Sequence, residues 1–323
     1  MYMDQQTKLD SKDYEILREL DKDFRQNFSK IAKKVKLSKN SVSLRYKKLK
    51  DLMLHNLVGI NNKVLGYTEV RIYCTFNYYD VETEKRLIDE IEKSQNIIWL
   101  ARYYGQYDVC ICFLVKDIDD FVTQMNRLNQ KLSDKINIKH TQIACKNFYF
   151  RYNFIHKKPI CTHYEICEKS QRKKINNSDK KILQQVKYDP RMHLIDIAEK
   201  TGMTIKTVST RLKELEKEGI IMGYFMTLNI TKFNHNTFKL LIRLNNLSQY
   251  KEFEKYLCSL KNIKYAIRMS GLWDYEVDFI FPTIRELQDQ IDEIKMVFPN
   301  LLKEYSILSF GKRVYTNTKN FPI

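Results

Sequence analysis

The sequence predicts an α+β protein built from two copies of one two-part unit. Residues align at a constant offset of 166 positions, as Asp13 does with Asp179 and Arg45 with Arg211. Each copy opens with three short amphipathic helical patterns. It then continues with strand and helix patterns in the order β-α-β-β-α-β. A repeat of such long period indicates a duplicated domain rather than a solenoid.

The first copy begins with three predicted helices. Residues 8–22 form the first, opened by Asp10 with Asp13 as a capping-box partner. Residues 29–35 form the second, and Ser38 caps the third. The buried stripe of the third helix consists of Val42, Tyr46 and Leu49. Because no glycine ends this helix, we expect residues 52–56 to extend it by about two residues and to displace the following strand.

The second copy has the clearer pattern. In residues 203–219, Thr204 caps a helix that Gly219 ends. The apolar stripe of that helix consists of Val208, Leu212 and Leu215. A short helix over 195–201 ends in a glycine turn just before it, and an earlier helix surrounds 182–186. This order predicts a helix-turn-helix, with a β-prone run at 220–224 as its wing.

The outward positions of both third helices carry cationic and short polar side chains. In the first copy they are Lys39, Asn40, Ser41, Ser43, Arg45 and Lys47. In the second copy they are Lys206, Thr207, Ser209, Thr210, Arg211 and Lys213. Asn40 suits a bidentate adenine contact, and Arg45 suits guanine or phosphate. The alternative for such a face is a solvated surface helix.

The formal charge of +17 is concentrated around the first set of helices. Residues 1–64 carry 15 basic and 8 acidic side chains, and residues 151–174 carry 7 and 2. Such an excess indicates a polyanionic partner, here double-stranded DNA, because neutralised phosphates release counterions. Solubility or a lysine-rich composition is the alternative. The predicted domains are helix-turn-helix regions 1–64 and 175–230, sheet regions 65–150 and 231–323, and a basic linker 151–174.

The β-α-β-β-α-β order predicts a ferredoxin-like sheet in each copy, with helices on one face and the other face open to a partner. On the third strand of the second sheet, Asp274, Glu276 and Asp278 share one face. The matching residues of the first sheet are Asp108, Cys110 and Cys112. We therefore expect asymmetric pairing of the two sheets, with Arg102 or Arg268 as counter-charges.

Cysteine usage and hydropathy indicate a reduced compartment. Four cysteines lie in apolar segments, namely Cys74, Cys110, Cys112 and Cys258. The first ten residues lack an export signal, and no apolar run approaches the ~20 residues that span a bilayer, so we expect a cytoplasmic protein without a membrane partner. The linker holds His156, Cys161, His163 and Cys167, but their spacing matches no standard zinc knuckle. We expect a solvated basic connector there, and no cofactor.

The pattern Ile-Ala-x(9)-Val-Ser-x-Arg-Leu-x-x-Leu, followed by Gly-Ile-Ile-x-Gly-Tyr over 197–224, resembles the leucine-responsive/AsnC family of transcription regulators. The sheet unit with Gly-x-x-Asp between its second and third strands resembles that family's RAM domain. The resemblance implies an amino-acid effector near this loop, where sheets pair within the chain or in a homo-oligomer. The residues that it implies are Gly105, Tyr107, Asp108, Gly271, Trp273 and Asp274. A plain hairpin turn is the alternative.

Three functions compete on these observations. The leading hypothesis is a sequence-specific regulator whose two recognition helices enter successive major grooves and read half-sites of unequal sequence. An architectural chromatin-type protein without an effector is the second. A siroheme-decarboxylase-like enzyme is the third, because such enzymes resemble the family in both domains. Only His235 near the second sheet suggests that chemistry, without a neighbouring arginine, so we expect a protein that is not an enzyme.

Overall fold

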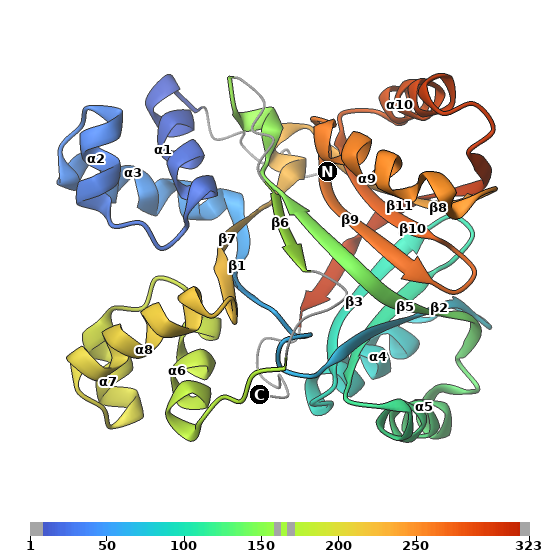
Figure 1. The fold of residues 1–323 in the computed structure, drawn as a ribbon, viewed down its shortest axis with the longest axis horizontal. Helices are drawn as coiled ribbons and strands as arrows, with labels where there is room; N and C mark the ends of the chain where they lie inside the picture. Colours follow the sequence, from blue (N-terminus) through green and yellow to red (C-terminus); the bar gives the residue numbers. More distant parts are fainter. Residues whose placement is uncertain (1–8, 158–162, 167–171, 317–323) are drawn as a thin grey trace. The chain divides into compact units, whose positions relative to one another are not determined.

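In a computed structural model, residues 9–157, 163–166 and 172–316 are described (Figure 1). They form two compact units. The helix-turn-helix unit draws on Met1–Ile60, Arg151–Thr162 and Asn176–His235. The barrel unit draws on Asn61–Phe150, His163–Ile175 and Asn236–Ile323. Each unit therefore combines matching segments of both sequence copies, and the predicted α+β class is confirmed.

The helix-turn-helix unit contains two three-helix bundles. The first consists of α1 (Ser11–Lys22), α2 (Phe28–Val35) and α3 (Lys39–Leu49), followed by η1 (Lys50–Leu52) and β1 (Met53–Ile60). The second consists of α6 (Asn177–Tyr188), α7 (Leu194–Thr201) and α8 (Ile205–Lys217), followed by β7 (Ile221–Leu228) and η3 (Ile230–Phe233). The segment η2 (Asn153–Ile155) also belongs to this unit. The predicted caps at Asp10, Ser38 and Thr204 are confirmed, and Asp13 completes the capping box.

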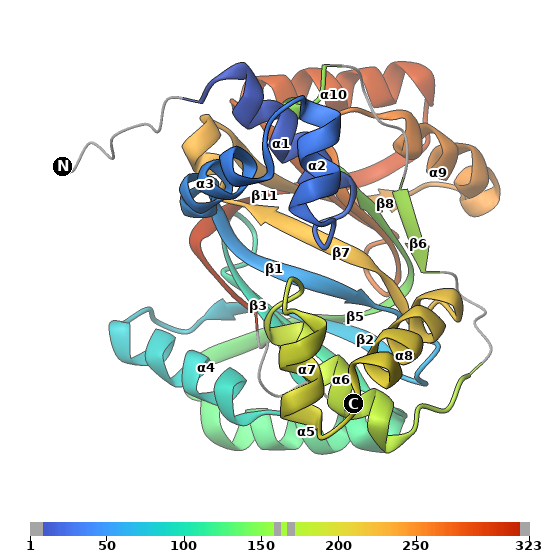
Figure 2. The same cartoon turned by 90° about the vertical axis from the view of Figure 1, so that its left-hand side faces the viewer.

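The predicted extension of the first recognition helix is wrong. Helix α3 ends at Leu49, and a single 3-10 turn leads directly into β1 at Met53. Leu52 is buried in that turn, whereas the second copy has Gly219, at φ +70°, just after its recognition helix. Neither bundle forms a wing hairpin of its own. Instead β1 pairs antiparallel with β7, so that the two wings make one shared ribbon (Figure 2).

Two arginines that occupy matching repeat positions fasten the bundles to each other. Arg25 donates to the carbonyl oxygens of Pro190 and Met192 at 2.5 and 3.0 Å. Arg191 donates in return to the carbonyl oxygen of Phe24. Since Phe24 and Pro190 also match in the repeat, the contact is reciprocal, and it forms a clamp that ties the turn after α1 to the turn after α6.

The predicted solvated linker is wrong where the structure describes it. Arg18 donates to the Ile155 carbonyl oxygen at 2.6 Å, and the His156 ring lies 2.8 Å from the Asp21 carboxylate. Residues 151–157 therefore pack on α1. Cys161 lies outside the described residues, as does Cys167.

The barrel unit contains both ferredoxin-like sheets. The first consists of β2 (Thr68–Phe76), α4 (Val81–Lys93), β3 (Ile97–Tyr104), β4 (Val109–Val115), α5 (Ile118–Leu132) and β5 (Ile136–Phe150). The second consists of β8 (Asn236–Leu244), η4 (Leu247–Gln249), α9 (Tyr250–Ser259), β9 (Ile263–Ser270), β10 (Tyr275–Phe281), α10 (Ile284–Val297) and β11 (Leu302–Thr316). The short strand β6 (His163–Ile166) joins the edge of β5.

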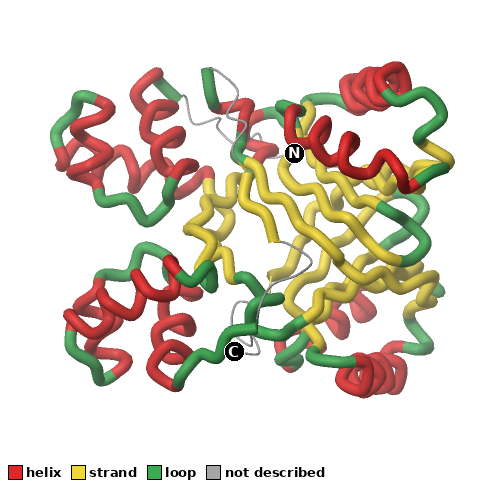
Figure 3. Tube along the Cα trace, in the orientation of Figure 1, coloured by secondary structure: helices red, strands yellow, loops and turns green. Residues whose placement is uncertain are grey.

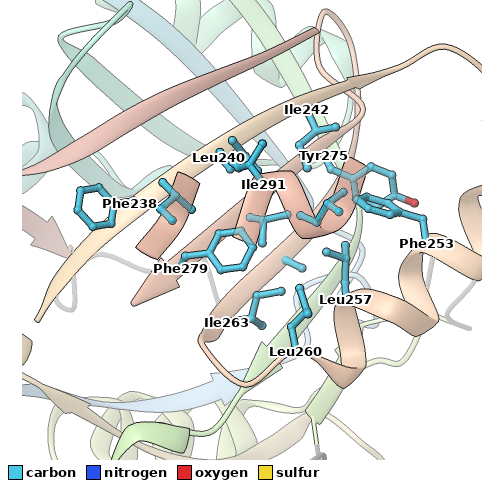
Figure 4. Close-up of a cluster of buried hydrophobic side chains, with 14 of the residues drawn as sticks. Phe238, Leu240, Ile242, Phe253, Leu257, Leu260, Ile263, Tyr275, Phe279 and Ile291 are labelled. Atoms are coloured by element: carbon cyan, nitrogen blue, oxygen red, sulfur yellow. The ribbon is translucent and has the colours of Figure 1, made fainter. Parts of the chain in front are cut away.

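The two sheets pair edge to edge within the chain. Strand β3 pairs with β11 and β5 pairs with β9, so the strand order β5-β2-β4-β3-β11-β8-β10-β9 closes on itself. The result is an eight-stranded barrel with the helices outside it (Figure 3). One strand face packs under the helices, as Phe238, Leu240 and Phe279 do under α9 and α10 (Figure 4). The opposite face of each strand lines the inside of the barrel, which we call the lumen.

Candidate nucleic-acid interface

The first recognition helix, α3, buries its predicted stripe and leaves its polar side open. Val42, Tyr46 and Leu49 are buried, whereas Lys39, Asn40 and Lys47 are exposed. Ser41 and Ser43 are half-buried. The Ser41 hydroxyl lies 2.8 Å from that of the cap, Ser38, so the hydroxyls at the helix start already engage each other. The open face of α3 also carries Leu44, 71% exposed, which the sequence pattern did not single out.

The second recognition helix, α8, has the same layout. Lys206, Thr207, Thr210 and Lys213 are exposed, and Ser209 is half-buried. None of the four lysines on the two helices, Lys39, Lys47, Lys206 and Lys213, forms an ion pair with a described residue. Both faces therefore present cations without internal partners, beside helix N-termini that attract anions.

The two arginines predicted to meet DNA are engaged by their own bundle. Arg45 lies 2.7 and 2.6 Å from the Asp10 and Asp13 carboxylates, which form the capping box of α1. Arg211 binds Asp179 through two nitrogens, at 2.8 and 2.6 Å, and also binds Glu214. These hydrogen bonds raise the pKa of both arginines. Each guanidinium thus holds the recognition helix to the first helix, which the predicted base contact did not anticipate.

The residues implied for an effector are all used by the fold. The Asp108 carboxylate accepts from the Phe76 N–H at 2.9 Å, and Asp274 accepts from Leu244 at 2.7 Å. Each aspartate thereby caps the end of a neighbouring strand. Tyr107 and Trp273 are buried. An effector contact by any of these side chains stays a prediction.

The two loop glycines lie where the sheets join. Gly105 has φ +144°, and a Cβ there would lie 2.9 Å from the Ile307 carbonyl oxygen of β11. Gly271 has φ +151°, and a Cβ there would lie 2.8 Å from the Thr141 carbonyl oxygen of β5. Thr141 and Ile307 match in the repeat. The backbone that approaches each glycine is therefore the other sheet, which excludes a side chain at both positions.

The lumen holds a buried network of charges that joins the two copies. Arg71 of β2 bonds to Glu69 at 2.5 Å and also pairs with Glu276 of β10. Lys239 of β8 lies 3.2 Å from Glu276 and 2.6 Å from Asp278. The expected asymmetry of the two sheets is thus present, but its cations are Arg71 and Lys239.

The predicted counter-charges, Arg102 and Arg268, were wrong. Arg102 lies over the rings of Phe76 and Tyr79, and Arg268 pairs with Glu254. Asp274 also leaves the predicted carboxylate set, because it caps a strand instead. The alternation of the sequence located the carboxylates of β10, but it did not indicate which strands of the barrel would face them.

Burial and charge set the pKa values inside the lumen. Burial would raise the pKa of Glu276, but the attraction of Arg71 and Lys239 outweighs it and holds that pKa below its usual value. At Asp278 burial prevails over Lys239 and raises the pKa. Burial also lowers the pKa of His140, whose ring stacks on Tyr73, to about 4. Three carboxyl groups thus share two cations beside a neutral imidazole.

Several buried polar atoms of the lumen lack a hydrogen-bond partner among the described residues. They include the Tyr103 hydroxyl, His140 Nε2 and both amide atoms of Gln142. Tyr103 and Gln142 are almost completely buried. Because native proteins rarely leave such groups unpaired, these atoms indicate bound water or a small polar ligand.

Comparison with known proteins relates both helical segments to regulators. Residues 9–50 match the profile of the AsnC-type helix-turn-helix domain, and residues 175–222 match that of winged helix-turn-helix DNA-binding domains. The leucine-responsive regulatory protein of Haemophilus influenzae is 30% identical over 112 residues, which cover 33% of this chain and 67% of that protein. The HTH-type transcriptional regulator LrpC of Bacillus subtilis is 22% identical over 120 residues, covering 37% and 83%.

The whole duplicated fold is similar to that of a solved enzyme structure. The siroheme decarboxylase NirDL covers 97% of this chain and 94% of its own, with a TM-score of 0.62 and 13% identity. Identity this low shows the shared fold alone. No helix among the described residues is long and apolar enough to cross a bilayer. The two helix-turn-helix profiles, the regulators of matching sequence and the paired recognition helices together place the chain in the leucine-responsive/AsnC family of DNA-binding transcription regulators.

Proposed function

We propose that this chain binds DNA as a single-chain equivalent of a dimer, with α3 and α8 each entering a major groove. The observation that carries the proposal is the pair of exposed lysine-bearing helix faces, which belong to one compact unit. The β1–β7 ribbon and the clamp of Arg25 and Arg191 support it, because both connect the two readers directly. A second chain is then unnecessary for reading two half-sites.

The proposed DNA contacts divide by role. Lys39, Lys47 and Lys213 are suited to phosphates, which set register and carry no sequence information. Lys206, which matches Asn40 in the repeat, is suited to a phosphate or to a base edge. Asn40, Thr210 and the serines at positions 41, 43 and 209 are suited to base edges or sugar-phosphate oxygens, as is Thr207. Arg45 and Arg211 support these contacts from behind by holding their helices in place.

A salt titration of duplex binding tests this assignment. The variant K39A/K47A loses two phosphate contacts, so the log–log slope of affinity against salt should become shallower by roughly 2. Lys85, exposed on α4 of the barrel unit, provides a matched control, and K85A should leave the slope unchanged. Equal slopes for the wild type and K39A/K47A would show that α3 is not a DNA reader. Binding that shows no preference among random duplexes would favour the architectural alternative.

Light scattering of the complex tests the single-chain proposal. One chain should saturate a duplex that carries both half-sites. A stoichiometry of two chains per duplex would instead show that a homo-oligomer binds the DNA.

We also propose that the regulators among the relatives, rather than the decarboxylase, indicate the activity of this chain. The lumen supports this, because its three carboxyl groups and two cations suit the carboxylates of a tetrapyrrole poorly. His235 supports it as well, since its ring stacks on Phe154 and its Nδ1 lies 2.7 Å from the Phe233 carbonyl oxygen. Added siroheme should give neither a Soret-type shift nor a decarboxylated product. A tight shift with turnover would reverse the assignment.

The regulatory ligand that we propose is a small amino acid held in the lumen near Tyr107 and Trp273. The support is the set of unpaired polar atoms on Tyr103, His140 and Gln142, together with the carboxylate Glu276, which suits an ammonium group. A screen of single amino acids by thermal unfolding tests it. The active amino acid should raise the melting temperature of the wild type but not that of Q142L, and it should change DNA affinity. If no amino acid raises the melting temperature, the proposed effector site is wrong, and the unpaired polar atoms of the lumen bind water instead.

A further inference from the structure

The two recognition helices expose different side chains at the positions best placed to reach base edges. On α3 these are Asn40 and Leu44, which lie one turn apart on the exposed side. The matching residues of α8 are Lys206 and Thr210, both exposed. The neighbouring positions differ less. Arg45 and Arg211 match each other and are both held by aspartates. At the first residue of each helix, Lys39 matches the exposed Ile205.

Leu44 is the informative member of this set. A leucine that is 71% exposed contributes nothing to the core of its bundle, and it lies between the exposed lysines of α3. Branched apolar side chains in the major groove contact the C5-methyl group of thymine. Asn40, at the other end of the same turn, has the amide that pairs with N6 and N7 of adenine. Both side chains therefore select A·T pairs.

The spacing of the two side chains fits base pairs about two steps apart. Four residues of helix rise about 6 Å, and base pairs are stacked about 3.4 Å apart. Asn40 and Leu44 thus reach positions roughly two steps apart in one groove. On α8, the ammonium group of Lys206 is suited to O6 and N7 of guanine at the position that Asn40 occupies on α3. The hydroxyl of Thr210 accepts either base.

We propose that Asn40 and Leu44 make the first half-site A·T-specific, whereas Lys206 makes the second half-site guanine-specific. This inference rests on the proposed DNA-binding function and assigns base identity to each reader. It also suggests what the duplication achieves: two recognition helices of different sequence within one chain can bind an operator that lacks twofold symmetry.

Binding-site selection with the full chain is the first test. Randomised duplexes should yield one half-site with adenine and thymine about two steps apart and another with guanine. Each wrong base pair should weaken binding about 5- to 150-fold, the equivalent of ~1–3 kcal/mol. Two A·T half-sites, or two guanine half-sites, would overturn the assignment.

A reciprocal exchange is the second test. The variant N40K/L44T gives α3 the pair that α8 carries, and it should change the preferred first half-site from A·T to guanine while the second half-site stays the same. Since all the exchanged positions are exposed, the melting temperature should stay close to that of the wild type. An unchanged first half-site in this variant would contradict the proposal.

Uracil in place of thymine isolates the leucine contact, because it removes only the methyl group. The wild type should lose several-fold affinity on the uracil duplex, and L44S, which has no methyl group to contact thymine, should lose none relative to its thymine duplex. Equal losses in both proteins would overturn the role of Leu44. A wild type that binds every duplex equally with a steep salt dependence would refute the base assignment alone, whereas no duplex binding at all would refute the proposed function.

Discussion

The two sequence copies still make matching contacts where the two helical bundles meet, a contact we call the seam. Their matching residues differ in the lumen of the barrel unit. At the seam, Arg25 and Arg191 match in the repeat and make reciprocal contacts. In the lumen, the sequence repeat matches Tyr73 with Lys239 and Cys110 with Glu276, so the matching residues differ in charge. The contacts of the two copies are thus equivalent where the two recognition-helix bundles join. They differ where the two sheets pair through charged lumen side chains.

The lumen should show the largest effect of a single substitution. Replacing Glu276 by Gln leaves Arg71 and Lys239 buried without their shared carboxylate, which should cost about 3–5 kcal/mol of unfolding free energy. Urea unfolding measures it. The matched change in the first copy, C110S, replaces an uncharged side chain and should cost less. A loss below about 1 kcal/mol in E276Q would show that the network does not determine sheet pairing.

A double change sharpens the same comparison. The apolar pair R71M/E276L removes both members of the ion pair that crosses between the copies. Part of the loss should be recovered relative to E276Q, because no buried cation is then left without a carboxylate. Lys239 keeps Asp278, and Glu69, which loses Arg71, keeps the hydrogen bond from the Asn147 amide. No recovery would indicate that Lys239 and Asp278 alone set the stability of the lumen.

Substitutions at the seam should cause the second-largest loss of stability, and the loss should be greater for Arg191 than for Arg25. Arg191 makes one hydrogen bond and lies over the rings of Phe24, Phe28 and Tyr46. Arg25 makes two hydrogen bonds but lies over the ring of Tyr224 alone among the described residues. We expect R191A to cost about 2–3 kcal/mol and R25A about 1 kcal/mol. Hydrogen exchange in α1 and α6 measures the loss of protection. Equal effects would mean that the ring contacts add nothing.

How far the sequence predicted this molecule depends on the kind of contact. Capping, the buried stripes and the repeat follow from local patterns, and Asp10, Ser38 and Thr204 cap the helices as predicted. The partner of a charged side chain does not follow locally. Arg71 lies 205 positions from Glu276, and only the closure of the barrel brings them together.

The sequence did contain one unused signal for the structural arginines. Asp13 and Asp179 match in the repeat just as Arg45 and Arg211 do, and each arginine pairs with the aspartate of its own copy. Two residue types retained together in both copies indicate a contact between them. Exposed Leu44 also had a signal in the pattern, because it lies about half a turn of helix away from the stripe of Val42, Tyr46 and Leu49 and therefore falls on the open face.

Low pH should destabilise the first sheet through His140. The matching residue of the second copy, Ser306, does not titrate. Burial lowers the pKa of His140 from 6.5 to about 4, so the folded barrel holds it neutral while the unfolded chain takes up a proton. Its contribution to stability is therefore complete above pH 6.5 and is lost as the pH falls toward 4. We expect about 1–2 kcal/mol after solvent screening. Unfolding of H140Q between these pH values should lack this loss.

The smallest effect should come from the arginines that first suggested base contacts. Arg45 and Arg211 are each about one third exposed, with side-chain exposures of 31% and 32%, so their ion pairs should contribute about 1 kcal/mol or less. R45Q and R211Q should therefore unfold slightly earlier and bind DNA somewhat more weakly. Both should nevertheless select the same bases as the wild type, because the guanidinium supports the helix without touching the groove. A changed base preference in either variant would return that arginine to the DNA interface, at the expense of the capping box that it now holds.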